Sequence, residues 1–91
     1  FEFPDGLKLY RKTPIFDEQS IPAGLLRDHV TKSGTWALII VEHGELQYSA
    51  GMYSEVLTAA KKGVVVPNMR HCVSPIGSVR FRLEFYARAE V

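Results

Sequence analysis

The histidines at positions 29, 43 and 71 and the single cysteine at position 72 are the side chains of this chain that could do the most chemistry. Neutral imidazoles bind Zn²⁺, Ni²⁺ or Fe²⁺, but a firm protein site needs three or four ligands. Other catalytic patterns are missing from the sequence, which has no Gly-rich phosphate loop, no cysteine pair and no nucleophile elbow. Histidine chemistry is therefore the first hypothesis for a function.

The stretch "GVVVPNMRHCVSP", residues 63–75, ends a run of valines at Pro67 and resumes at His71. On a strand, neighbouring side chains point to opposite faces, so His71 and Cys72 are expected to point apart. A lone cysteine is most simply a small buried hydrophobe. Reaction of Cys72 with an oxidising oxyanion, or a bridge between two chains, is the less favoured alternative.

A third metal ligand is hard to find. His43 lies beside Gly44 and is interpreted as a turn-side residue. Glu84 alternates with Leu83 and Phe85 and is expected to meet solvent. Glu45 and Glu55 lie near the ends of expected strands, and nothing in the sequence distinguishes them as ligands.

The elements that must position these residues are strands. Residues 78–87, "SVRFRLEFYA", alternate apolar and polar side chains, which is typical of a strand with one face on a core. Residues 35–51 are predicted to form a hairpin with "HG" as its turn. Residues 54–67 are predicted to form a strand, a Lys-Lys-Gly turn and a second strand, although residues 54–62 could also be helical. Residues 23–32, "AGLLRDHVTK", are also predicted to be a strand.

In this strand, alternation places Arg27, His29 and Thr31 on one face. Before it, Pro4, Pro14 and Pro22 favour edge strands and turns over a helix. Many short strands with Gly and Pro turns indicate a sandwich or a small barrel.

Composition narrows the function classes. The 91 residues suffice for one domain, with 46% hydrophobic residues, 23% charged residues and a net charge of +1. We therefore expect no nucleic-acid partner and no membrane surface as a partner. No apolar run approaches the roughly 18 residues of a transmembrane helix, and we see no signal peptide. One cysteine excludes an internal disulfide and fits a reducing cytoplasm.

The order "LRDHVTKSGTW", an apolar strand, "GELQY", "VVVPNMRHCVSP" and "VRFRLEFY" resembles a small single-domain cupin. More closely, the chain is similar to the TehB/YeaR-like cupins, the domain that also precedes the methyltransferase in some tellurite-resistance proteins. The stretch "PAGLLRDHVTKSGTW" is the most specific part of this resemblance. The resemblance implies an all-β, jelly-roll cupin barrel over residues 1–91, bacterial and cytoplasmic, and often a homodimer.

The resemblance also implies a site. His29 matches the first histidine of the cupin motif, whereas Thr31 stands in place of the second and Trp36 is nearest to the expected Glu. In the second motif Pro67 and His71 match, with one residue fewer between them than in the general cupin pattern. Arg70 stands where the TehB/YeaR-like family commonly has a tryptophan. The barrel would bring His29 and His71, which are 42 positions apart, to one cavity as ligands of a divalent metal, Zn, Ni or Fe.

The same cavity suggests a second use. A set of Arg27, Thr31 and imidazoles offers donors for an oxyanion or carboxylate, without a metal. Alternatively, Arg27 pairs on the surface with Asp28 or Glu42. Trp36 is most simply core, like the other large aromatic residues, and is otherwise the wall of a ligand pocket.

Three functions are compatible with these residues and with the resemblance. The first is a small binding or stress-response protein that holds a divalent metal or a small oxyanion. The second is a metal-dependent cupin enzyme of the dioxygenase or isomerase type, which should keep three protein ligands. The third is a structural dimerisation module with a vestigial cavity. The two matched histidines favour the binding protein.

Overall fold

The structure, a computed structural model, describes residues 3–27, 29–31 and 33–88, and describes His29 through its backbone. This part of the chain forms seven strands in one antiparallel sheet and a single turn of 3₁₀ helix, which confirms the all-β class. The elements are β1 (Leu7–Lys12), β2 (Phe16–Asp17), η1 (Ala23–Leu26), β3 (His29–Val30), β4 (Trp36–Ala50), β5 (Tyr53–Leu57), β6 (Gly63–Val65) and β7 (Arg70–Arg88).

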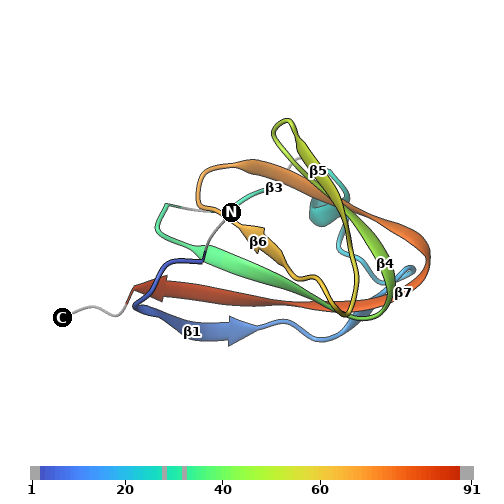
Figure 1. Ribbon diagram of the computed structural model, residues 1–91, viewed down its shortest axis with the longest axis horizontal. Coiled ribbons are helices and arrows are strands. Elements are labelled where there is room, and N and C mark those ends of the chain that lie inside the picture. The colour runs from blue at the N-terminus through green and yellow to red at the C-terminus, as the bar shows by residue number, and fades with distance from the viewer. Residues whose placement is uncertain (1–2, 28, 32, 89–91) are drawn as a thin grey trace.

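Two long strands, β4 and β7, organise the sheet. They pair antiparallel from Trp36 opposite Tyr86 to Ala50 opposite His71. The short strands β1, β2 and β3 pair with the other edge of β7, and β5 and β6 pair with the other edge of β4 (Figure 1). Every short strand therefore depends on one of the two long ones for its hydrogen bonds.

The predicted hairpin at "HG" is wrong, because β4 runs straight through these two residues. The β4–β7 register shifts between Val41 and His43 and again between Gly44 and Glu45, so the strand bulges instead of reversing. Gly44 has a φ of 80°, and a Cβ atom there would lie 2.1 Å from the backbone oxygen of Ser78. Only glycine permits this close approach of two bent strands.

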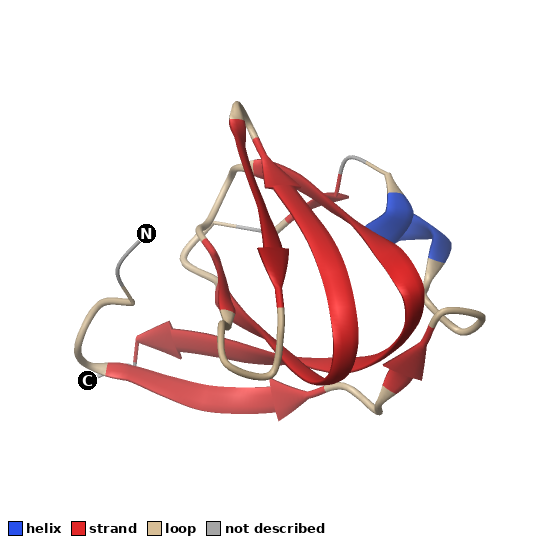
Figure 2. Ribbon diagram, turned by 45° about the vertical axis from the view of Figure 1, so that its right-hand side comes forward, coloured by secondary structure: helices blue, strands red, loops and turns tan. Residues whose placement is uncertain are grey.

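The bend curls the sheet (Figure 2). Buried side chains alternate along β4 and β7, as the pattern of residues 78–87 predicts. The predicted barrel is not confirmed: the sheet order β1-β7-β4-β5 ends in two open edges among the described residues. The core consists of Ile21, Leu25, Ala37, Ile39, Val41, Leu46, Tyr48, Ala50, Leu57, Val65, Val73, Val79, Phe81 and Leu83.

Residues 23–32 are a strand only at His29–Val30. The backbone N–H of Leu25 donates to the carbonyl oxygen of Pro22 at 2.9 Å, which closes the turn of η1. This turn buries Leu25 and leaves Leu26 exposed, so the chain loses the alternation that the sequence suggested. Asp28 and Lys32 lie outside the described residues.

The strands predicted in residues 54–67 are confirmed as β5 and β6, and the helical alternative is wrong. The turn between them comes earlier than Lys-Lys-Gly: Thr58 and Lys61 exchange two backbone hydrogen bonds, of 3.3 and 2.9 Å. Near the N-terminus, β1 and β2 are short and flank Pro14, as expected for edge strands. No helix in the described ranges is long and apolar enough to span a membrane.

Candidate functional site

The pairing of β3 with β7 brings the two predicted metal ligands together in the backbone. His29 lies directly opposite His71 in this antiparallel ladder, and Val30 lies opposite Arg70. His71 is only 2% exposed. Two residues 42 positions apart in the sequence therefore become neighbours, and the inward orientation expected for His71 is confirmed.

The ring of His71 is held from two sides. Its Nδ1 atom lies 3.2 Å from the carbonyl oxygen of Met69, and its ring centroid lies 6.3 Å from that of Tyr48, edge to face. The Tyr48 hydroxyl donates to the carbonyl oxygen of Val64 at 2.9 Å. Burial raises the pKa of Tyr48 to about 12, so this phenol stays neutral.

Thr31 is buried beside this region. Its hydroxyl donates to the carbonyl oxygen of Val66 at 3.1 Å, and its own carbonyl oxygen accepts from the backbone N–H of Asn68 at 3.1 Å. Thr31 thus joins the end of β3 to the turn that precedes β7. Its hydroxyl keeps lone pairs that could accept a hydrogen bond, while its proton is used in the fold.

Arg27 lies at the end of η1, outside β3, with an exposed side chain. It therefore does not share a strand face with Thr31, and the predicted in-phase set of Arg27, His29 and Thr31 is wrong in this respect. The alternative partner Glu42 pairs instead with Arg82, at 2.6 Å. The other alternative, Asp28, lies outside the described residues.

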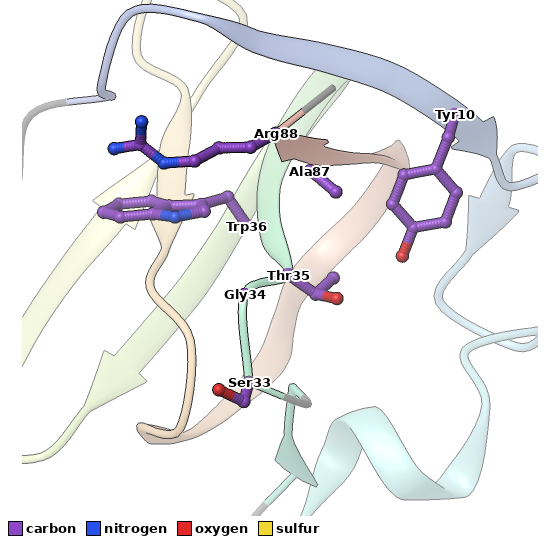
Figure 3. A pocket seen from close by; sticks show the side chains of 7 residues that line it. All are labelled: Tyr10, Ser33, Gly34, Thr35, Trp36, Ala87 and Arg88. Atoms are coloured by element: carbon purple, nitrogen blue, oxygen red, sulfur yellow. The ribbon is translucent and has the colours of Figure 1, made fainter. Parts of the chain in front are cut away.

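Trp36 lines a cavity of about 460 Å³ at the end of the sheet where β4 begins (Figure 3). It lies opposite Tyr86 in the register, whereas His71 lies opposite Ala50 at the far end of β4. In this register, Trp36 therefore lies at the opposite end of β4 from the residue that His71 faces. The cavity is lined by Tyr10, Ser33, Gly34, Thr35, Trp36, Ala87 and Arg88.

The expectation that Glu84 meets solvent is wrong, because this residue is only 8% exposed. The hydroxyl of Tyr86 donates to its Oε1 at 2.8 Å, and the Nε and Nη2 atoms of Arg82 donate to its Oε2 at 3.3 and 3.2 Å. Phe3 covers Tyr86 with a ring-to-ring distance of 4.8 Å. The only sequence signal for this network was the i, i+2 spacing of Arg82, Glu84 and Tyr86.

The pKa of Glu84 reflects two opposing effects. Burial alone would raise the pKa, but the hydrogen bonds from Tyr86 and Arg82 and the positive charge of Arg82 outweigh it. The net result is a pKa below the usual value of 4.5. Glu84 is therefore ionised at neutral pH and supports the fold as an ion-pair partner.

The described residues contain no group of three or more His, Cys, Asp or Glu side chains arranged to hold a metal. His43 is exposed at the bend, and Glu55 pairs with Lys61 at 2.6 Å. Cys72 is half-buried on the opposite face of β7 from His71, as alternation predicts.

These features define a small all-β domain with a curled open sheet, a buried histidine near its core and a cavity at one end. Residues 11–83 match the family model described as the TehB-like domain. The chain belongs to the TehB-like family.

Solved structures show the same fold. A crystal structure of a protein from E. coli strain K12 is 22% identical with a TM-score of 0.91, and the match covers 99% of each chain. The crystal structure of TehB from Haemophilus influenzae is 23% identical with a TM-score of 0.86, over 92% of this chain and 32% of TehB. The chain thus corresponds to about a third of TehB. None of the curated proteins matches this sequence.

Proposed function

We propose that this chain is a small binding module of the TehB-like family that holds a divalent metal between His29 and His71. The observation that carries the proposal is the β3–β7 register, which sets these two residues opposite each other. The imidazole of His71 is buried. Histidine is the commonest protein ligand of Zn²⁺, Ni²⁺ and Fe²⁺.

The surroundings of His71 suit a ligand. Its Nδ1 lies within hydrogen-bond distance of the carbonyl of Met69, so in the tautomer with Nδ1–H the lone pair is on Nε2. Metal-bound histidines commonly fix their second nitrogen on a carbonyl in this way. With Thr31 where cupins carry another histidine, water or an anion would complete the coordination. A small oxyanion of the tellurite type is the ligand we propose for these open positions.

We further propose that the curled sheet is a cupin-type jelly roll. The bend at Gly44 lets β4 and β7 each contribute to two layers, which is how a short chain builds such an architecture. The proposal includes a cytoplasmic location, because the single thiol of Cys72 fits a reducing compartment. We favour a binding module over a dioxygenase or isomerase, since catalytic cupins keep three protein ligands.

The test is calorimetric titration of the metal-free protein with Zn²⁺ and Ni²⁺. We expect about one equivalent to bind, and the affinity to fall at least about tenfold in His29→Gln and in His71→Gln. His43→Gln is the matched control, because this histidine is exposed at the bend, and it should bind like the wild type.

Circular dichroism must first show that each variant keeps its sheet. If His71→Gln fails to fold, His29→Gln alone decides the result. Equal affinity in the wild type and His29→Gln would overturn the proposed metal site, as would a wild type that binds no Zn²⁺ or Ni²⁺.

A further inference from the structure

Strand β1 forms one edge of the sheet. Among the described residues it pairs with β7 alone, and it stands at one end of the order β1-β7-β4-β5. Figures 1 and 2 show β1 along the outside of the molecule, with no strand on its far side. In an antiparallel ladder, alternate residues turn their N–H and C=O groups away from the partner strand. The far side of β1 therefore presents backbone donors and acceptors to which another strand can pair.

The side chains of β1 sort onto two faces. Lys8 and Arg11 lie opposite positions 87 and 85 of β7, which alternate by two, so these two cations share one face. The register shift between Leu9 and Arg11 allows this, because it inserts Tyr10 as an extra residue. Leu7 and Leu9 lie opposite positions 88 and 86, on the other face. The edge thus carries two cations on one face and two leucines on the other.

The cations of this edge have no carboxylate of their own. The sequence of β1, "LKLYRK", holds three basic residues and no acidic one. None of the three salt bridges among the described residues involves a residue of β1. The guanidinium of Arg11 lies 5.7 Å from the ring centroid of Phe85, which is an uncharged partner. Lys8 and Arg11 are exposed, so carboxylates of a partner can reach them.

These charges select the kind of strand that can add to β1. Two copies of β1 side by side would bring lysine and arginine next to each other, and like charges across a strand pair are destabilising. A strand with carboxylates at alternate positions would instead meet Lys8 and Arg11 with the opposite charge. Apolar residues between the carboxylates would fall on the face of Leu7 and Leu9, because the side-chain period of a strand is two.

We propose that the free edge of β1 binds an extended acidic segment of another protein, in which Asp or Glu alternates with apolar residues. The segment adds to the sheet as a strand beside β1. Backbone hydrogen bonds supply affinity in this mode of recognition, and the alternating side chains supply specificity. The site uses no residue of the histidine pair, so it does not depend on the proposed metal.

The probe is an end-capped peptide of sequence GEVEVEVG, titrated into the protein by calorimetry and followed by NMR amide hydrogen exchange. We expect saturable binding. The outward amides of β1 should exchange about tenfold more slowly at a peptide concentration of about ten times Kd, because exchange then occurs from the unbound fraction. The variant Lys8→Gln/Arg11→Gln should bind at least about fivefold more weakly. Lys62→Gln/Arg80→Gln is the matched control, since it removes the same charge from exposed positions outside β1.

Two further peptides separate strand addition from general attraction between charges. GKVKVKVG has the opposite charge and should bind at least about tenfold more weakly. GEEEVVVG has the same composition without the alternation, and it should also bind more weakly than the alternating peptide. The proposal is overturned if GEVEVEVG does not bind by about 1 mM, if GEEEVVVG binds equally well, or if the two double variants bind alike. Slower exchange in β5 with none in β1 would also overturn it.

Discussion

Glu84 shows how a single residue can contradict a clear pattern. Alternation places it correctly on the face of β7 opposite Leu83, but that face is not simply solvent. Its carboxylate is buried and accepts hydrogen bonds from Arg82 and Tyr86, and Phe3 packs against the ring of Tyr86. Phe3 comes from the opposite end of the chain, so no local pattern can reveal this contact.

We expect Glu84→Gln to lower the free energy of unfolding by about 1–2 kcal/mol at pH 7, because it removes a buried charge-assisted interaction. The pKa of Glu84 is lower in the folded chain than the usual 4.5, so its stabilisation is complete above that value. It is lost as the pH falls through the folded pKa. Urea unfolding between pH 7 and pH 2.5 should therefore show the wild type and the variant converging in acid.

Glu45→Gln is the control for this prediction, because Glu45 is exposed at the bend. Its unfolding free energy should stay within about 0.5 kcal/mol of the wild type at pH 7. Curves for Glu84→Gln and the wild type that remain parallel down to pH 2.5 would contradict the assigned role of the carboxylate.

At the residue scale, the sequence predicts orientation best where one core face decides the outcome. Alternation correctly predicts that His71 and Cys72 point to opposite faces, whereas the inward orientation of His71 came from the family resemblance. The opposition of His29 and His71 required the family resemblance, because register between distant strands leaves no mark on either strand. Binding of a metal or oxyanion by these residues stays a prediction.

At the scale of the elements, the feature that determines the fold is the bend of β4 and β7. "HG" signals a change of direction, but the sequence cannot distinguish a tight turn from a bulge without knowing the partner strand. Here the partner supplies Gly77 and Ser78 as additional residues at the same level, and both strands bend together. A bulge thus bends a strand within its sheet, whereas a two-residue turn would reverse the direction of the chain.

We expect Gly44→Ala to destabilise the domain by about 3 kcal/mol or more. The positive φ of 80° costs an alanine about 1–2 kcal/mol, and the new methyl would overlap the backbone of Ser78, which adds a packing cost. Thermal unfolding followed by circular dichroism measures the change.

Gly77→Ala provides a matched control at the same bend. Gly77 also has a positive φ, of 67°, but its added Cβ would meet no atom within 4 Å. We expect only the conformational cost of about 1–2 kcal/mol. Equal losses in the two variants would mean that close approach to Ser78 does not constrain β4.

On the scale of the whole molecule, we predict self-association through an open edge of the sheet that the described residues form. β5 is an edge strand whose neighbourhood exposes Met52, Tyr53 and Val56. Exposed apolar edge strands pair readily with other chains. We therefore expect a homodimer formed through the β5 edge, in line with the family resemblance.

Light scattering after size-exclusion chromatography tests this expectation. The wild type should have a mass near twice 10.2 kDa, and Val56→Lys should shift it toward the monomer, because an edge lysine blocks strand addition. Ile76→Lys is the control, since Ile76 is a comparably exposed apolar residue at the bend. A wild type that stays monomeric at high concentration would exclude the dimer.

The continuity of β4 and β7 through the bend has a consequence for how the domain comes apart. The two central strands of each half of the curled sheet are parts of the same two strands, β4 and β7. The halves are therefore joined by continuous backbone and do not form separate sheets. If the part of the sheet around His71 unfolded, β4 and β7 would continue beyond the part around Phe81 without their hydrogen-bond partners. The residues around His71 and those around Phe81 therefore belong to one cooperative unit, and we expect a single unfolding transition.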